Sequence, residues 1–279
     1  MNNERASDKM VFCTTRIIAY RNRNDSYADA GTGFFYTYKD RIYLVTNKHV
    51  LANAEIVEFK VVTQDKNGKL DYGSLATTRL DKDLLQKRSC GHPSKNVDIQ
   101  VIDLMGCDID IREPDRVAYF CPIDESLIPD QKGLEDLFAI ERVVFVGYPN
   151  SMWDEVNHLP IIRSGTTASL LTIDFNGEPK FLIDASVFPG SSGSPVFIND
   201  DSWYSNRRGV RIGVPRMLFL GVISGVYIES ETEDIEIVPA PTTNKFSSSS
   251  TPVIDLGIVE KAKTVQETVE LCYNKIMKK

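Results

Sequence analysis

A serine-rich segment in the second half of the chain has the residue types of a nucleophile loop. It reads GSSGSPV over residues 190–196 and lies between two apolar runs. Gly190 and Gly193 can adopt the positive φ or the close approach that such a loop needs, and Pro195 stiffens its exit. In that shape the backbone N–H groups of Gly190 and Ser192 can point to one spot and form an oxyanion hole. The segment therefore predicts acyl-transfer chemistry, with an ordinary Ser/Gly hairpin loop as the alternative.

A serine nucleophile needs a base, and the chain has only three histidines, His49, His92 and His158. All three precede the serine segment, so a histidine base must come first in the chain. This order excludes the α/β-hydrolases, whose order is Ser, acid, His, and Ser194 also breaks their G-x-S-x-G elbow. His49 follows the strand-like run YLVTN and precedes a small-residue turn that could be a short helix, which is a suitable place beside a cleft.

An acidic residue is needed to orient the histidine, and Asp98 is the best-placed candidate. It opens the run VDIQVIDL, at the mouth of a predicted strand. A half-buried carboxylate there can accept the Nδ1–H of a histidine and fix its tautomer. Asp103, Asp108 and Asp110 compete for this role, but they lie at the end of the strand or beyond it.

The elements that must position these residues are short β-strands in two series. Runs rich in Val, Ile, Tyr, Phe and Thr predict strands at 11–21, 31–38, 41–47, 55–64 and 97–104, and again at 142–149, 160–175, 179–188, 194–198 and 217–228. Residues 65–69 predict a turn, and residues 38–41 a hairpin. Strands at this spacing, with little helical periodicity, indicate a sandwich or barrels rather than βαβ units.

The acidic, proline-punctuated segment 121–139 predicts the connection between the two series. We therefore expect an N-terminal β unit over 1–125, a C-terminal β unit over 126–259 and a helix over 260–279. Apolar residues of the tail recur near helical spacing, which predicts one amphipathic helix packed on the second unit. The polar segment 230–252 predicts a loop that is mobile in its middle.

Composition limits the partners and the compartment. The 279 residues carry a formal net charge of -7 and no Lys/Arg block, so nucleic acid and anionic membrane are not expected partners. The N-terminus lacks a signal peptide pattern, which predicts a cytoplasmic protein. The five scattered cysteines contain no C-x-x-C pair and predict reduced thiols. A zinc site of Cys90, His92, Cys107 and Cys121 is the alternative, although this spacing fits no recognised pattern.

The segments TNKHV, NVDIQVI and GSSGSPV together resemble the signatures of the chymotrypsin/trypsin-like serine proteases, in that family's order. The likeness is closest to bacterial Deg/Htr-type peptidases, since GTGFFY, RSGTTAS and LGVISG also match in place, and it covers about residues 11–260. The resemblance implies an all-β fold of two six-stranded antiparallel β-barrels, here with a C-terminal α-helix. We expect no PDZ domain, because little chain follows residue 260.

The resemblance also implies the role of each site residue. Ser192 would be the nucleophile, His49 the general base and then acid, and Asp98 the orienting group, with Gly190 and Ser192 donating the oxyanion hole. The reaction would be hydrolysis of protein or peptide substrates through an acyl-enzyme, with no metal or organic cofactor. Alignment on Ser192 places the base of the specificity pocket at Ser186 and its lining strand at Ser224, Gly225 and Val226. Without an acidic base, this pocket predicts cleavage after small or medium uncharged residues.

Two positions depart from the family pattern. Ser191 stands where digestive relatives carry an Asp that pairs with a new N-terminus, so we hypothesise control by a regulatory protein partner, oligomerisation or substrate. Gln100 replaces a small residue two positions after Asp98 and is expected to crowd it or to hydrogen-bond near it. Two alternatives stay open: a catalytically weak or inactive binding module, and an esterase or acyltransferase on the same fold.

Overall fold

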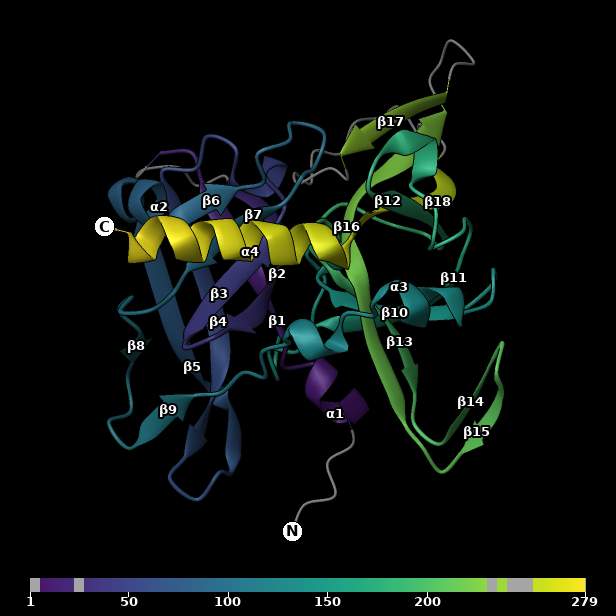
Figure 1. The fold of residues 1–279 in the computed structure, drawn as a ribbon. Coiled ribbons are helices and arrows are strands. Elements are labelled where there is room, and N and C mark those ends of the chain that lie inside the picture. The colour runs from purple at the N-terminus through teal and green to yellow at the C-terminus, as the bar shows by residue number, and fades with distance from the viewer. Residues whose placement is uncertain (1–5, 23–27, 230–234, 240–252, 279) are drawn as a thin grey trace.

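The protein is built from two antiparallel β-sheets that lie side by side, with a long helix across one face (Figure 1). The computed structural model describes residues 6–22, 28–229, 235–239 and 253–278. The first sheet comes from the N-terminal half of the chain and the second from the C-terminal half. The mostly β architecture with a C-terminal helix is therefore confirmed.

The first sheet runs in the order β6-β7-β3-β2-β1-β4-β5-β8, and β9 pairs with β4. Its strands are β1 (Thr14–Tyr20), β2 (Ala28–Tyr38), β3 (Arg41–Thr46), β4 (Ile56–Asp65), β5 (Leu70–Asp81), β6 (Ser89–Gly91), β7 (Gln100–Asp103), β8 (Asp110–Ile111) and β9 (Arg116–Ala118). In the described part of the chain, β6 and β8 stand at the two ends of this order and are not paired with one another. A closed barrel in the N-terminal half therefore stays a prediction.

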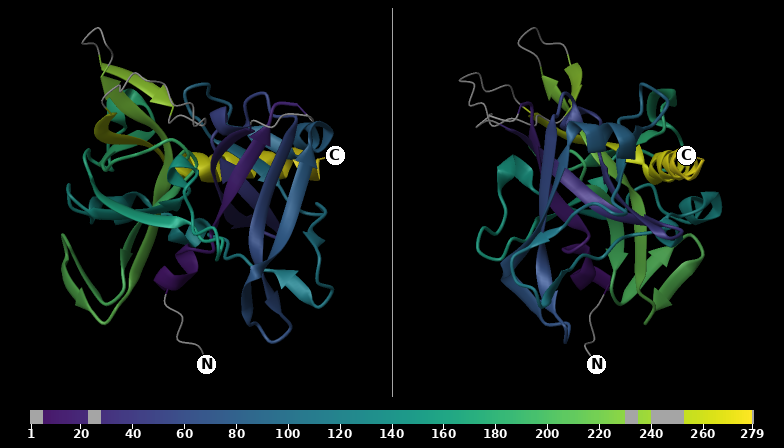
Figure 2. Two further views of the ribbon diagram at one scale, coloured as in Figure 1. Left: turned by 180° about the vertical axis from the view of Figure 1, so that it is seen from behind. Right: turned by 90° about the vertical axis from the view of Figure 1, so that its left-hand side faces the viewer.

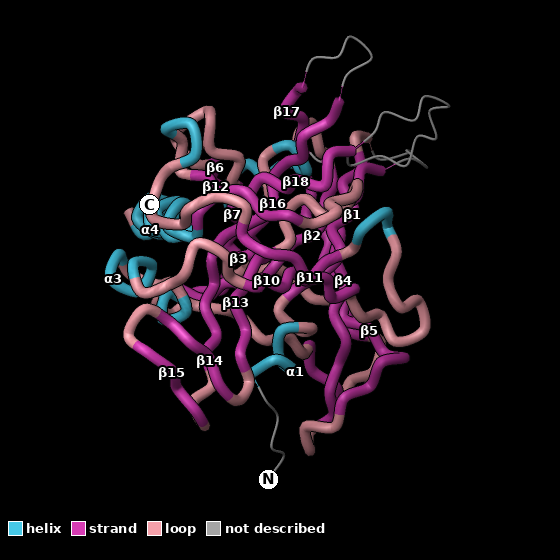
Figure 3. Tube along the Cα trace, turned by 90° about the vertical axis from the view of Figure 1, so that its right-hand side faces the viewer, coloured by secondary structure: helices cyan, strands magenta, loops and turns pink. Residues whose placement is uncertain are grey.

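The second sheet closes on itself. In the part of the chain that the structure describes, β13, β10, β11, β12, β18 and β16 pair in sequence, and β13 also pairs with β16, which makes a six-stranded barrel. β17 extends this sheet beside β16, and β14 with β15 forms a separate projecting ribbon (Figure 3). The strands are β10 (Arg142–Gly147), β11 (Ile161–Thr167), β12 (Lys180–Asp184), β13 (Pro195–Asp200), β14 (Trp203–Asn206), β15 (Gly209–Ile212), β16 (Arg216–Glu229), β17 (Ile235–Pro239) and β18 (Val253–Lys261).

The helices are short except for the last. They are α1 (Ala6–Met10), α2 (Lys82–Arg88), α3 (Gln131–Glu135), α4 (Ala262–Met277) and the single 3-10 turns η1 (His49–Leu51), η2 (Glu125–Leu127), η3 (Pro149–Ser151) and η4 (Phe175–Gly177). No helix in the described ranges is both long and apolar enough to cross a membrane.

Local sequence explains the sharp turns of the first sheet. The β2–β3 hairpin pairs Tyr38 with Arg41, and Lys39 takes a positive φ of 54° at its tip. In the turn at 65–69 the Asp65 carboxylate accepts hydrogen bonds from the backbone N–H groups of Asn67 and Lys69, and Gly68 supplies a φ of 79°. Both turns confirm the sequence prediction.

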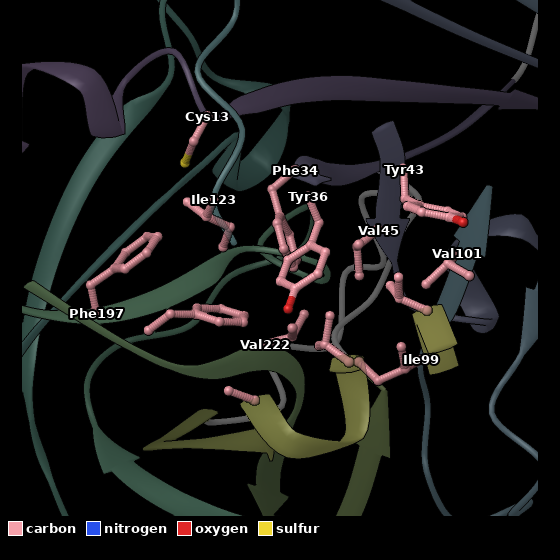
Figure 4. Close-up of a cluster of buried hydrophobic side chains, with 14 of the residues drawn as sticks. Cys13, Phe34, Tyr36, Tyr43, Val45, Ile99, Val101, Ile123, Phe197 and Val222 are labelled. Atoms are coloured by element: carbon pink, nitrogen blue, oxygen red, sulfur yellow. The ribbon is translucent and has the colours of Figure 1, made fainter. Parts of the chain in front are cut away.

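One apolar cluster joins the two sheets and the helix (Figure 4). Phe34 of β2 meets Phe219 of β16 edge to face, with ring centroids 5.4 Å apart. Buried side chains of α4 complete the cluster, namely Val265, Val269 and Cys272. Because close-packed aromatic and aliphatic side chains resist displacement, this shared core fixes the position of one half relative to the other.

The position of α4 corrects one expectation. The tail forms the predicted helix, but it packs on β6 and β7 of the first sheet as well as on β16 and β18 of the second. In the side view of Figure 2 the helix lies along one outer face of the molecule. The reason is that the apolar stripe of α4 buries itself in the cluster shared by both sheets, and not on the second sheet alone.

Several element boundaries also differ from the sequence expectation. The strand predicted over 160–175 ends at Thr167, and the one predicted over 179–188 ends at Asp184. In the polar segment 230–252 the described part is the strand β17, and the predicted mobile middle lies outside the described residues. The connection at 121–139 carries η2 and α3 between the sheets. The division into three domains stays a prediction.

Candidate active site

The first sheet fixes His49 at the end of β3. Buried Thr46 ends the strand, and the chain turns at once into η1, the short helix expected there. Val50 anchors this turn in the core under Gly31, where an added Cβ would lie 2.7 Å from the valine side chain. The Ala52 N–H donates to the His49 carbonyl at 3.3 Å and closes the turn. His49 thus stands on a rigid corner with 19% of its side chain exposed.

Asp98 lies beside His49 because β7 pairs with β3, which places Gln100 opposite Thr46. The Asn47 side-chain amide donates to the Asp98 carbonyl at 2.6 Å. The Asp98 carboxylate accepts the backbone N–H of His49 at 3.2 Å and faces His49 Nδ1 at 2.5 Å. These contacts orient both the carboxylate and the imidazole ring.

The competing carboxylate Asp103 lies at the other end of β7. It is 1% exposed and forms ion pairs with Arg41 at 2.6 Å and Arg88 at 3.5 Å. The hydrogen bonds that Arg41 donates to Asp103 raise the pKa of the Arg41 guanidinium above its usual range. Asp103 is therefore a structural ion-pair partner and does not face the histidine.

Ser192 comes from the second sheet, in the loop between β12 and β13. Its Oγ lies 2.8 Å from His49 Nε2. Since Asp98 is an acceptor, His49 carries its proton on Nδ1, and Nε2 is left to accept the proton of the serine hydroxyl. The two halves of the protein thus bring a hydroxyl, an imidazole and a carboxylate into one hydrogen-bonded row.

Thr32, which the sequence analysis did not single out, holds the Ser192 loop in shape. Its backbone N–H donates to the Ser192 carbonyl at 2.8 Å, and its hydroxyl donates to the Gly190 carbonyl at 2.9 Å. Gly190 and Gly193 have φ values of 86° and 88°. A Cβ added at Gly193 would overlap the Thr32 carbonyl oxygen, so glycine is required there. Thr32 belongs to the GTGFFY segment. The resemblance of this segment to the family pattern was the feature of the sequence that could have pointed to Thr32.

The remaining predicted residues of this loop are buried. Gly190 is buried, and Ser192 has no exposed surface in this conformation. Ser191, at the position of the expected latch, is 1% exposed, and its Oγ has no hydrogen-bond partner among the described residues. The oxyanion role of the Gly190 and Ser192 N–H groups stays a prediction.

The predicted specificity residues all come from the C-terminal half of the chain. Ser186 is half-buried in the extended segment after β12, while Ser224, Gly225 and Val226 are buried in β16. The Val226 side chain packs in the barrel core with Val187 and Ile223. Their role in substrate selection stays a prediction.

The Gln100 side chain lies beside the neighbouring strand β6, and its effect on Asp98 stays a prediction. Its side-chain amide lies over Gly91 of β6, where an added Cβ would be 2.8 Å from Gln100 Oε1. Gly91 and Gln100 are opposite one another in the β6–β7 pair. Glycine at position 91 therefore leaves the space that the longer side chain occupies.

Glu260 is a second site residue that sequence reasoning missed. It is wholly buried near the end of β18, and its Oε1 accepts the backbone N–H of Asp98 at 3.2 Å. Burial raises its pKa to about 7, against the opposing charge of Lys180. Glu260 directly follows the apolar run LGIV. This position could have pointed to Glu260 in the sequence, because a carboxylate at the end of a buried strand seldom lacks a partner.

The zinc alternative finds no support. His92 pairs with Glu267, Cys107 Sγ lies near the Asp103 carbonyl, and Cys121 Sγ lies near the Tyr119 hydroxyl. Over the described ranges, no three His, Cys, Asp or Glu side chains are grouped to hold a metal ion. Cys13, Cys90, Cys107, Cys121 and Cys272 all lie in the described ranges, and none of them forms a disulfide there.

Sequence comparison decides the family. Residues 31–203 match the family model of the trypsin-like peptidase domain, which is more than half of the chain. The chain belongs to the trypsin-like peptidases. The match contains His49, Asp98 and Ser192, and it confirms the family that their motifs predict.

Two solved structures are similar to this chain over most of its length. Two chains of the HtrA-type protease AlgW, each with a tripeptide and one of them a variant, are similar to this peptidase with TM-scores of 0.49 and 0.47 and identities of 13% and 14%. The alignments cover 97% of this chain but only 62% and 63% of those chains. No curated protein sequence matches the chain significantly.

Proposed function

We propose that this trypsin-like peptidase is a serine endopeptidase that uses His49, Asp98 and Ser192. The observation that carries the proposal is the imidazole of His49, which lies 2.8 Å from the Ser192 hydroxyl through one nitrogen and 2.5 Å from the Asp98 carboxylate through the other. This is the arrangement that activates a serine for acyl transfer. The residues also belong to the matched domain.

The proposed reaction has two halves. Ser192 Oγ attacks the carbonyl carbon of the scissile bond while its proton passes to His49 Nε2, and Asp98 stabilises the imidazolium that forms. The N–H groups of Gly190 and Ser192 stabilise the oxyanion. His49 then gives the proton to the leaving amine, the C–N bond breaks, and Ser192 carries the acyl group. Water, deprotonated by His49, releases the acid and restores the serine.

For the substrate, we propose proteins or peptides cut after small or medium uncharged residues. In this proposal Ser186 forms the base of the pocket, where it offers a hydroxyl and no charge to pair with Arg or Lys. A peptide-library cleavage profile tests this. Dominance of Ala, Val or Leu before the cut supports the proposal, and dominance of Arg, Lys, Phe or Tyr contradicts it.

For regulation, we propose that a protein partner, self-association or substrate raises the activity of the site above a basal level that the chain has alone. Two observations support this: Ser192 has no exposed surface, and Ser191 replaces the latch carboxylate with a hydroxyl that has no partner in the described structure. We also propose that the enzyme is intracellular and of the Deg/Htr type. In this proposal the N-terminal half of the chain forms a second barrel. Cleavage of unfolded protein at full rate by the purified chain alone would contradict partner control.

Active-site labelling tests the proposed function. A fluorophosphonate probe forms a covalent bond with an activated serine Oγ, so the native chain should become labelled and Ser192→Ala should not. Ser164→Ala, which removes an exposed hydroxyl on β11, is the matched control and should label like the native chain. Equal labelling of Ser192→Ala would contradict the nucleophile. No labelling under any condition would favour the binding module, and labelling without peptide cleavage would favour an esterase or acyltransferase.

A further inference from the structure

A buried carboxylate contacts the candidate triad at Asp98. Glu260 is the last residue but one of β18, directly before Lys261 and α4. Its side chain has no exposed surface, and its Oε1 accepts the Asp98 backbone N–H at 3.2 Å. It comes from the second sheet, whereas Asp98 and His49 come from the first. The contact therefore spans the junction between the two halves at the residue that orients the histidine.

The charged neighbours of Glu260 compensate its charge only in part. Lys180 of β12 is the nearest cation, with its Nζ 3.7 Å from Glu260 Oε1, but the same Nζ lies 2.6 Å from Glu178 Oε2. Lys48 contributes from a greater distance, and its ammonium donates to the Ser94 carbonyl at 2.8 Å. Lys180 also faces the Tyr227 phenol. Glu260 therefore shares its counter-ion.

The other contacts of Glu260 act in opposite directions. The Ser224 hydroxyl and the Asp98 N–H favour the ionised carboxylate, while the nearby Asp98 charge disfavours it. Glu260 Oε2 is buried and has no hydrogen-bond partner among the described residues. Burial dominates, since a charge is costly away from water, and the pKa of Glu260 is raised to about 7. The carboxyl group therefore changes charge close to neutral pH.

We propose that Glu260 is a positioning residue of the triad: it holds the Asp98 backbone through its N–H and, when ionised, adds a second negative charge behind the His49–Asp98 pair. The first effect fixes the carboxylate that orients His49. The second stabilises the imidazolium that forms as Ser192 attacks, because an additional anion nearby favours the charged imidazole. This inference rests on the proposed function, since it assigns Glu260 to the same site.

Two consequences follow for pH dependence. His49 must be neutral to accept the serine proton, and Glu260 must be ionised to give its full effect. Labelling of the native chain should therefore rise with pH more steeply than one ionisation allows, as two interacting groups titrate together. Replacing Glu260 with Gln keeps an oxygen that accepts the Asp98 N–H but removes the charge, so one of the two ionisations should disappear.

The test compares four proteins from pH 5.5 to 9 with the fluorophosphonate probe. For each, the maximal labelling rate is separated from the probe affinity. Glu260→Gln should reduce the maximal rate at high pH about three- to tenfold, show a single ionisation and leave the probe affinity unchanged. Glu260→Ala should lose at least as much. Glu141→Gln is the matched control, because Glu141 is also a buried, ion-paired Glu but pairs with Arg216 in the second barrel. It should behave as the native chain does.

A second measurement needs no catalysis. NMR titration of the His49 ring, with Ser192→Ala as the background, should show a lower His49 pKa in Glu260→Gln than in the background and no change in Glu141→Gln. If the native chain fails to label, the proposed function is contradicted, while the NMR titration still decides the role of Glu260. If the native chain labels, but Glu260→Gln keeps both the native pH profile and the native His49 pKa, the positioning role is contradicted.

Discussion

A carboxylate lies on either side of strand β7, since Asp103 is its last residue and Asp98 comes two residues before its first, and the surroundings of the two differ. At the carboxyl end, Asp103 meets Arg41 through two hydrogen bonds of 3.1 and 2.6 Å and also faces Arg88. At the amino end, Asp98 faces His49, and the buried Glu260 lies behind it with one shared cation. The fully paired end is suited to hold the fold. The underpaired end has groups that can change charge, which is what proton transfer requires.

Replacing Asp98 with Asn should produce the largest effect on chemistry. The amide cannot hold His49 in the required tautomer, so labelling of Ser192 should fall about 10⁴-fold. Stability should change little, because the side chain is 25% exposed. Labelling rates and urea unfolding measure the two quantities. Loss of stability with labelling intact would reverse the roles of the two ends.

Replacing Asp103 with Asn should produce the opposite result. Two arginines would be left without their partner, and breaking such a buried pair costs about 3–5 kcal/mol in the free energy of unfolding. The labelling rate per folded molecule should stay within about twofold of the native rate, since Asp103 lies at the far end of the strand. A large fall in labelling of protein shown to be folded would contradict the separation of the two ends.

Glu260 predicts how stability changes with pH. Its pKa is raised from 4.5 to about 7 in the folded protein, so between these values the folded state binds more protons than the unfolded state. Its contribution is therefore fully present below pH 4.5 and is lost as the pH rises through 7, by about 3 kcal/mol. Urea unfolding from pH 4.5 to 8 should show this loss in the native chain and not in Glu260→Gln. Identical pH dependence of the two proteins would mean that Glu260 does not titrate in this range.

Lys180→Met should give the smallest effect. The substitution removes the cation nearest Glu260, so the pKa of Glu260 should rise further, by about one unit. The second ionisation in the labelling profile should move up in pH by the same amount, while the rate at high pH stays unchanged. A downward movement would show that Lys180 does not face an ionised Glu260.

The sequence predicts the triad better than its surroundings because the triad lies in continuous segments. TNKHV, NVDIQVI and GSSGSPV each combine a reactive residue with the turn or strand residues that present it. Glu260 is different, since it reaches Asp98 across 162 residues of chain through the register of β18. The apolar run before Glu260 marks a carboxylate at the end of a buried strand, but no local pattern names Asp98 as its partner. Thr32 holds the serine loop across the same junction and was also missed.

Elements were predicted where periodicity is strong and missed where tertiary contacts decide. The tail pattern predicts α4, but the same apolar stripe could face either sheet, and the shared core determines that it faces both. β12 ends at Asp184, the last residue of the β12–β18 pairing, whereas the composition favours a strand that continues to Phe188. The β14–β15 ribbon exposes Trp203 and Ile212, so it lacks the buried alternation that identifies a strand.

Trapping the acyl-enzyme tests the central claim most directly. The protein is mixed with a peptide substrate, quenched in acid within the first turnover, digested and mapped by mass spectrometry. We expect the amino-side fragment of the substrate to be attached to Ser192, and Ser192→Ala to give neither adduct nor product. Product formed by Ser192→Ala at the native rate, or an acyl group attached to another residue, would contradict it.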